Sequence, residues 1–345
     1  MLGHGVLRSS AIVADQLTTV RPATQAGDML AYRFAALFPG QGSQRPAMAA
    51  QLAAVDARSR TPYLDIADDL LGMPLRRLCL QGSADELRDT AVAQPAILLT
   101  SLIALELLRE RGLEPSVTAG HSLGEFTALV AAGVLEWTDA LRLVHRRGQM
   151  MSRVGQAAPG GMAAVLGIDA ARVEEICARV ARTGDGTVEV ANYNSERQTV
   201  VSGTTTGVAA ASAAARELGA DVVALKVSAP FHCSLMRDIE QEFASALAEV
   251  AFATPRIPVV STVTAQPLMD GQAAAAALQR QLCAPVRWHE VVRALAEQEV
   301  STFVEVGAGR VLTNLGRAIA PGIPTVPAGT GAQLDAAAVH LRAPA

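Results

Sequence analysis

The pentapeptide GHSLG at residues 120–124 decides the fold of this chain. A short apolar run, Val117 to Ala119, precedes it, and a helical pattern from Glu125 to Val134 follows. Strand, Gly-x-Ser-x-Gly and helix in this order are the layout of a nucleophile elbow. The turn is so tight that both flanking positions need glycine, because a side chain there would collide with backbone. The pattern predicts that the hydroxyl of Ser122 stands at the top of a sheet, facing the positive end of a helix.

The composition indicates a globular protein with a sizeable core and no nucleic-acid partner. Half of the 345 residues are apolar, and the length suggests one large domain or two smaller ones. The net charge of −4 gives no basic footprint for nucleic acid or for an anionic membrane. The four cysteines are scattered without a C-x-x-C pair, so we expect neither a disulfide framework nor a metal site.

No segment predicts a membrane span or a signal peptide. The best apolar run, Ala96 to Leu105, is too short and contains Thr100 and Ser101. Residues 1–32 lack a continuous signal-peptide core, and we interpret them as a flexible N-terminal extension. We therefore expect a cytoplasmic protein.

Strands and helices alternate along most of the chain, which favours an α/β fold. Residues 33–38 read as a strand, and residues 96–109 as a helix that is buried because it is apolar nearly all round. With the elbow, these elements predict an α/β-hydrolase-like large subdomain over residues 33–157 and 228–330. We expect further strands at 256–261 and 302–306, further helices at 288–298 and 311–319, and a C-terminal tail at 331–345.

Residues 158–227 have their own order of predicted strands and helices. Asp169 is the expected N-cap of one helix, with Gly184 just past its end, and Gly219 closes a second helix. The order β-α-β-β-α-β is the ferredoxin-like pattern, so we expect a small inserted subdomain. Its strands are expected at 162–168, 187–192, 198–202 and 221–227, and its helices at 169–182 and 205–218.

A serine hydroxyl needs a base to act as a nucleophile at neutral pH, and His232 is the best candidate. It follows the strand that leaves the small subdomain, and α/β proteins place sites in loops at the carboxyl ends of strands. His121 adjoins Ser122 but should point away from it. No Asp or Glu lies where a triad needs one, which favours a Ser–His dyad oriented by a backbone carbonyl.

Arg147 has two interpretations. A guanidinium can bind a carboxylate through two parallel hydrogen bonds, so this residue is a candidate for recognising an acidic substrate. The alternative is an exposed arginine on a helix, and the spacing of the residues leaves both open.

Seven segments in order resemble the malonyl-CoA:acyl carrier protein transacylase family, and the similarity runs from about Phe34 to about Ile319. That family includes the acyltransferase domains of polyketide synthases and their freestanding, trans-acting counterparts. The segments are FPGQGSQ at 38–44, QPA at 94–96, GHSLGE at 120–125, RRGQMM at 146–151, ANYNS at 191–195, PFHCSLM at 230–236 and VEVGAG at 304–309.

The resemblance implies definite roles. Ser122 would be the nucleophile and His232 its base, oriented by the main-chain carbonyl of Gln281. Arg147 would pair with the free carboxylate of a malonyl group. The reaction would need no metal and no bound cofactor, with malonyl-CoA as the substrate.

The resemblance also implies an oxyanion hole and a pocket. The backbone N–H groups of Gln41 and Leu123 would hold the oxyanion. Family members with phenylalanine before the histidine tend to take malonyl, because a bulky ring crowds an α-methyl branch. In this chain Ala229-Pro230 departs from the family's selectivity signature. The residues expected to shape the pocket are Phe231, Gln94, Asn192 and Asn194.

The expected reaction is a ping-pong transfer of malonyl from CoA, through an ester on Ser122, to the phosphopantetheine thiol of an acyl carrier protein. The alternatives are hydrolysis of acyl groups on carrier proteins and transfer of another dicarboxylic acyl unit. An ordinary esterase is disfavoured by the missing acid, and a non-catalytic docking module would be expected to lose Ser122 or His232. Because carrier proteins are generally acidic, Arg146 or Arg287 are candidates for guiding them, and a monomer is expected.

Overall fold

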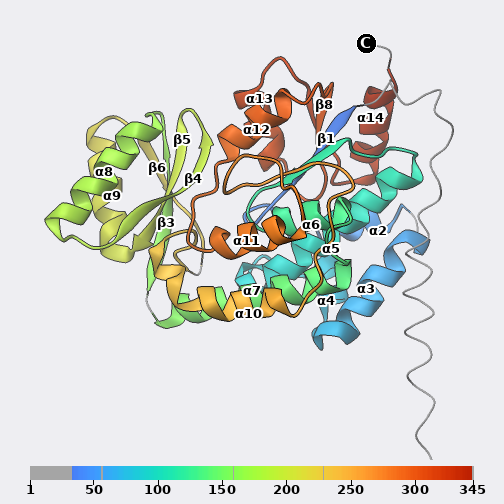
Figure 1. Cartoon of the computed structure of the whole chain (residues 1–345), viewed down its shortest axis with the longest axis horizontal. Coiled ribbons are helices and arrows are strands. Elements are labelled where there is room, and N and C mark those ends of the chain that lie inside the picture. The colour runs from blue at the N-terminus through green and yellow to red at the C-terminus, as the bar shows by residue number, and fades with distance from the viewer. Residues whose placement is uncertain (1–32, 56, 158, 228, 344–345) are drawn as a thin grey trace, which may run out of the picture.

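The computed structural model describes residues 33–55, 57–157, 159–227 and 229–343, and their strands form two separate sheets (Figure 1). The predicted flexible extension, residues 1–32, lies outside the described residues. The larger sheet has the order β7-β2-β1-β8-β9 with every pair parallel. Its strands are β1 (Phe34–Phe38), β2 (Val117–Gly120), β7 (Val259–Val260), β8 (Thr302–Glu305) and β9 (Thr325–Pro327).

Helices cover both faces of the larger sheet, which explains why its strands are continuous apolar runs. Phe34 and Phe38 of β1 face the larger hydrophobic cluster, which includes α5 and α6, whereas Leu37 faces the cluster of α12 and α13. The helices of this part are α2 (Ala50–Ala53), α3 (Ala57–Leu71), α4 (Leu75–Gln81), η1 (Glu86–Arg88), α5 (Thr90–Glu110), α6 (Gly124–Ala131), α7 (Trp137–Ala157), η2 (Ser234–Ile239), α10 (Glu240–Ala248), α11 (Gly271–Gln281), α12 (Trp288–Ala296), α13 (Val311–Ile319) and α14 (Gly331–Arg342).

Helix α5 runs through the core. Its length and composition would suffice for a membrane span, but 83% of its most apolar window is buried inside the structure, as in a core helix. Pro95 lies inside α5 and cannot donate to the carbonyl of Ala91. Nδ1 of His145 on α7 lies 3.3 Å from that carbonyl oxygen, so His145 compensates for the missing hydrogen bond in the tautomer that carries a proton there. Helices α5 and α7 are thereby tied together beside the site.

The smaller sheet has the order β4-β5-β3-β6 with antiparallel pairs, which is the ferredoxin-like arrangement. The side chain of Asp169 caps α8, and Gly184 ends that helix with a φ of +77°, as predicted. The fold class expected from the sequence is therefore confirmed. The elements are β3 (Gly160–Leu166), α8 (Ala170–Thr183), β4 (Val188–Ser195), β5 (Gln198–Thr204), α9 (Thr205–Glu217) and β6 (Asp221–Ala224).

The structure corrects the predicted C-terminal tail. Residues 331–342 form α14, capped by Thr330, and bury Leu334 and Leu341 against the core. The segment is so rich in alanine that its apolar face is weakly marked, and contacts with distant residues decide its structure.

Two predicted strands are shorter than expected. β7 keeps only Val259 and Val260 of the predicted 256–261, because Pro258 has no N–H to donate to the sheet. β6 ends at Ala224, after which Leu225 still donates to the carbonyl of Met162 and the chain turns away. Residues 225–227 are thereby directed toward the site described next.

Strand β4 also pairs with the segment before α12, at a short parallel bridge. Tyr193 of β4 donates to the carbonyl of Val286 at 2.9 Å, and Val286 donates to the carbonyl of Ala191 at 2.9 Å. The segment before α12 therefore extends the small sheet.

Candidate active site

The elbow has the geometry that its sequence predicts. Ser122 follows β2 with a φ of +51°, a left-handed conformation that is rare for residues other than glycine. A Cβ at Gly120 would lie 1.9 Å from the carbonyl carbon of Gly124, and one at Gly124 would lie 2.0 Å from the carbonyl oxygen of Phe38. Neither position can hold a larger residue, so β2 and α6 approach closely enough to present Ser122.

Ser122 and His232 form a hydrogen-bonded pair. Oγ of Ser122 lies 2.7 Å from Nε2 of His232, and Nδ1 of His232 lies 2.8 Å from the carbonyl oxygen of Gln281. A carbonyl can only accept, so Nδ1 carries the proton and Nε2 is free to accept the proton of the serine. Gln281 is the last residue of α11, where carbonyls have no partner within the helix, and this leaves its oxygen for His232.

The electrostatics keep His232 neutral. Burial and the positive charge of Arg147 lower the pKa of His232 to about 3. The imidazole is therefore neutral at neutral pH, with Nε2 unprotonated, which is the state required of a base.

Arg147 is a buried cation beside the nucleophile. It is 2% exposed, so the interpretation as an exposed helix arginine does not hold. Its guanidinium donates to Oγ of Ser122 at 3.2 Å, to Oε1 of Gln94 at 2.8 Å and to Oε1 of Gln281 at 2.9 Å. Burial lowers the pKa of Arg147 only to about 10, so it remains charged at neutral pH.

No described carboxylate forms an ion pair with Arg147. Its Nε is buried without a hydrogen-bond acceptor in the described part of the chain, and Phe126 lies under the guanidinium at 5.9 Å from ring centre to Cζ. Glu125 raises the pKa of Arg147 electrostatically but forms no ion pair with it. A buried cation without an ion-pair partner is costly, so the site is poised to receive an anion next to Ser122.

Gln281 connects these groups. Its carbonyl orients His232, and its Oε1 accepts from Arg147. Its Nε2 donates to the carbonyl of Ser122 at 3.1 Å and to Oε2 of Glu125 at 2.6 Å. Glu125 is fully buried and also accepts from Thr262 Oγ1, and burial raises the pKa of its carboxyl. The resemblance implied a role for the Gln281 carbonyl alone, and it gave no role to Glu125.

The predicted oxyanion hole is open. Neither N–H group, of Gln41 or of Leu123, donates to a protein acceptor among the described residues. Leu123 is the N-cap residue of α6, so the helix dipole points at the same place. Both residues line one cavity with Ser122, as the assigned role requires.

That cavity has a volume of about 340 Å³. Of the predicted pocket residues, Phe231 and Asn192 line it. Gln94 accepts from Arg147, and Oδ1 of Asn194 instead accepts a hydrogen bond from Nε2 of His121 at 3.0 Å. His121 lines the cavity, but its ring is held by Asn194 and packs on Trp288, away from the Ser122 hydroxyl.

Lys226 is a cavity residue that was not predicted from the sequence. It is the only lysine of the sequence, is exposed, and lines the cavity beside Leu225 and Val227. The two arginines suggested for guiding a carrier protein lie elsewhere: Arg146 pairs with Glu249 at 2.6 Å, and Arg287 pairs with Glu290 at 2.6 Å. The sequence did carry a signal for Lys226, because it is the only lysine of the sequence and lies shortly before the histidine segment at 230–236.

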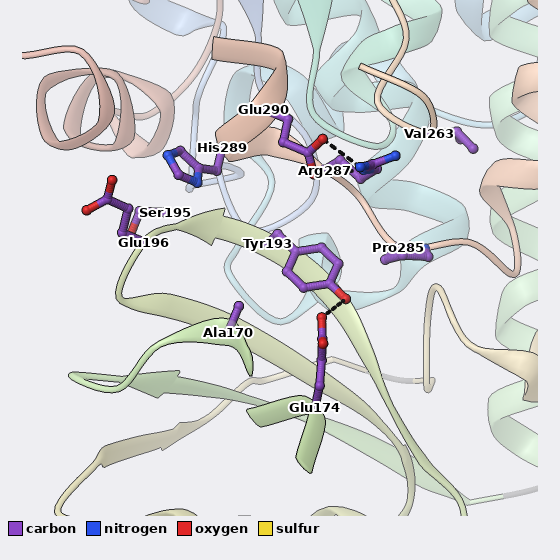
Figure 2. Close-up of a pocket in the computed structure, with 10 residues that line it drawn as sticks. All are labelled: Ala170, Glu174, Tyr193, Ser195, Glu196, Val263, Pro285, Arg287, His289 and Glu290. Carbon is purple, nitrogen blue, oxygen red and sulfur yellow. Dashed lines mark hydrogen bonds and ion pairs between the residues drawn. The ribbon is translucent and has the colours of Figure 1, made fainter. Parts of the chain in front are cut away.

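A second cavity of about 530 Å³ is lined by residues of β4 and of the segment before α12 (Figure 2). Tyr193 lines it, whereas the preceding Asn192 lines the cavity of Ser122, because successive strand residues point to opposite faces. Figure 2 shows Tyr193 bonded to Glu174 and Arg287 bonded to Glu290. Arg287, a candidate for guiding a carrier protein, lines this second cavity, whereas none of the residues predicted for catalysis, the oxyanion hole or the substrate pocket does.

Comparison with known proteins places this geometry in a class. A family model described as acyl transferase domain matches residues 36–319. The malonyl CoA-acyl carrier protein transacylase of Bacillus subtilis strain 168 is 41% identical over 285 residues, covering 82% of this chain and 89% of that protein.

Solved structures agree with the sequence relatives. The acyl-carrier-protein S-malonyltransferase of Burkholderia pseudomallei 1710b is similar with a TM-score of 0.84 and 39% identity, covering 89% of this chain and 99% of that one. A malonyl transacylase in complex with its type II polyketide acyl carrier protein is similar with a TM-score of 0.85 and 37% identity, covering 89% and 99%. The chain therefore belongs to the acyltransferase family, and within it to the malonyl-CoA:acyl carrier protein transacylases.

Proposed function

We propose that this protein transfers a malonyl group from malonyl-CoA to the phosphopantetheine thiol of an acyl carrier protein. The observation that carries the proposal is the buried guanidinium of Arg147, which contacts the nucleophilic oxygen of Ser122 and pairs with no described carboxylate. A malonyl thioester supplies a carboxylate two bonds from the carbonyl that Ser122 attacks. One substrate thus satisfies both groups.

Acylation begins at the Ser122–His232 pair. Oγ of Ser122 attacks the thioester carbonyl carbon while Nε2 of His232 takes the hydroxyl proton. The N–H groups of Gln41 and Leu123 hold the oxyanion of the tetrahedral intermediate. The carbon–sulfur bond then breaks, the CoA thiolate takes the proton from His232, and a malonyl ester remains on Ser122.

Transfer to the carrier reverses these steps. His232 takes the proton of the phosphopantetheine thiol, the sulfur attacks the ester carbonyl, and the Ser122 oxygen leaves and recovers the proton. Every group in this sequence belongs to the chain or to its two substrates, so the proposal includes no metal and no bound cofactor.

Hydrolysis is the rival function. A hydrolase that clears neutral acyl chains gives the buried Arg147 no anionic partner, which argues against it. Transfer of another dicarboxylic acyl unit remains the second alternative, because Arg147 recognises the distal carboxylate and not the chain between. The tight packing of Phe231, 5% exposed in the cavity wall, favours the unbranched malonyl group.

The test combines malonyl-CoA with a phosphopantetheinylated carrier protein and follows malonyl on the carrier by mass. Transfer by the parent chain, and none by Ser122→Ala, supports the proposal. Release of free CoA and malonate without malonyl on the carrier would establish the hydrolase instead. A cytoplasmic location and a monomeric state are further parts of the proposal, and sedimentation of the purified chain tests the second.

A further inference from the structure

We propose that Thr90 is a positioning residue that connects the carboxylate-binding Arg147 to the oxyanion-hole residue Gln41. The inference deepens the proposed function and rests on it. Among the described residues the Thr90 hydroxyl bonds to Gln41 and Gln94 and not to Ser122 or His232. Thr90 also lies in none of the segments that carry the family resemblance.

The connection is a continuous chain of hydrogen bonds. Arg147 donates to Oε1 of Gln94 at 2.8 Å, Nε2 of Gln94 donates to Oγ1 of Thr90 at 2.8 Å, and Oγ1 of Thr90 donates to Oε1 of Gln41 at 2.8 Å. Arg147 and Gln94 are buried, and Thr90 is fully buried. Three short bonds therefore join the two ends of the site without passing through the catalytic pair.

The direction of each bond is determined by chemistry. A guanidinium only donates, so it must face the carbonyl oxygen of the Gln94 amide and leave the NH₂ group facing Thr90. The Thr90 oxygen accepts a hydrogen bond from that NH₂ group, so its own hydroxyl is free to donate to the amide oxygen of Gln41. Hydrogen bonds in such a directed chain polarise one another and rigidify the groups that they join.

The backbone and side chain of Thr90 are held rigidly. It is the first residue of α5, whose N-cap Asp89 accepts from the N–H of Ala91 at 3.0 Å. Next to Arg147 on α7, a Cβ at Gly148 would lie 2.7 Å from the carbonyl oxygen of Thr90, so the two backbones are in contact. The branched side chain of threonine further restricts its rotamers. Thr90 is thus held in a fixed position between α7 and the loop of Gln41.

The loop of Gln41 needs a rigid neighbour to hold its backbone N–H in place. Gln41 lies outside any helix or strand and is only half-buried, yet its N–H must be aimed at the oxyanion. Preorganised donors are effective because they need no reorganisation during the reaction, and a displacement of about 1 Å can cost about 100-fold in rate. Thr90 therefore acts on the transition state, and its loss is expected to lower kcat with little change in KM.

The experiment compares three variants in steady-state transfer from malonyl-CoA to a holo carrier protein. Thr90→Val removes the hydroxyl at nearly constant shape and is expected to lower kcat about 10- to 100-fold with KM within about 3-fold of the parent. Thr90→Ser retains the hydroxyl and should recover most of the rate. Thr100→Val is the matched control, since Thr100 is equally buried on the same helix and its hydroxyl bonds to the carbonyl of Ala96 and to Cys79, away from Gln41 and Arg147.

The outcomes separate this inference from the proposed function. If the parent chain does not transfer malonyl, the proposed function fails. If the parent transfers malonyl and Thr90→Val does so at the parental kcat, the inference about Thr90 is wrong. Equal losses in Thr90→Val and Thr90→Ser, or in Thr100→Val, would also overturn it, because they would indicate a packing effect and not the hydroxyl.

Discussion

The guanidinium of Arg147 donates to Oγ of Ser122 at 3.2 Å, although Arg147 lies on α7 and Ser122 lies in the turn between β2 and α6. The group proposed to recognise the substrate is therefore in contact with the group proposed to attack it. A single bound malonyl can replace this contact with a carboxylate partner, and recognition places the carbonyl next to the nucleophile.

Arg147→Ala should shift the preference of the enzyme from malonyl-CoA toward acetyl-CoA. Loss of a buried, hydrogen-bonded charge pair costs about 2–5 kcal/mol. We therefore expect kcat/KM for malonyl-CoA to fall by roughly 30-fold or more, at about 1.4 kcal/mol per tenfold, while loading from acetyl-CoA rises. Rates of loading from the two thioesters measure this. The adjacent Arg146→Ala is the control, because Arg146 is exposed and pairs with Glu249; equal behaviour of the two variants would contradict the assigned role.

The pH dependence should show that His232 stays neutral well below its usual range. Its pKa is lowered from 6.5 to about 3, so the active base persists as the pH falls through 6.5. We expect single-turnover acylation to show no inflection from His232 between about pH 5 and 8. An inflection near pH 6.5 that disappears in His232→Gln would show that the imidazole is not held neutral.

The same shift affects stability. Between about pH 3 and 6.5 the unfolded chain binds a proton on His232 that the folded chain does not, so this residue makes the free energy of unfolding fall as the pH falls. Arg147→Ala removes one cause of the lowered pKa and should raise the pKa of His232. NMR titration of the imidazole measures the shift, and an unchanged or lower pKa would be inconsistent with the electrostatic account.

The elbow glycines should tolerate no side chain. Gly120→Ala places a Cβ against the backbone of Gly124 and is expected to destabilise the fold by roughly 3 kcal/mol or more. Gly161→Ala is the control, because nothing lies within 4 Å of a Cβ there. Denaturant unfolding of both variants tests this. Similar free energies of unfolding would mean that the turn is less tight than described.

Phe231 should limit branched substrates. Because its ring lines the cavity, Phe231→Ser is expected to raise the preference for methylmalonyl-CoA over malonyl-CoA by about 10-fold or more. Phe231→Tyr keeps the bulk and should keep the parental preference. Competition between the two thioesters gives the ratio of methylmalonyl to malonyl transfer directly. If this ratio does not change in Phe231→Ser, Phe231 does not determine the selectivity.

Much of the framework is predictable because it depends on local rules. The helix expected at 311–319 has those bounds in the structure, and Asp169 and Gly184 cap α8 as their side chains and backbone preferences indicate. The elbow is likewise specified within five residues. Such features need no knowledge of what packs against them.

The remaining features depend on contacts between distant residues. The alanine-rich α14 is stabilised by the core that it covers, and the burial of Arg147 depends on α5 and α11. The side chain of Gln281 meets Glu125 across 156 positions of sequence, and periodicity carries no sign of such a contact. Thr90 reads as an ordinary helix start until the loop of Gln41 is placed beside it.

The most direct test of the central claim is the mass of the intact protein after incubation with malonyl-CoA in the absence of a carrier. We predict a malonyl adduct on the parent chain that is absent from Ser122→Ala. An adduct that persists in Ser122→Ala, or CoA release with no adduct on the parent, would contradict a malonyl ester on Ser122.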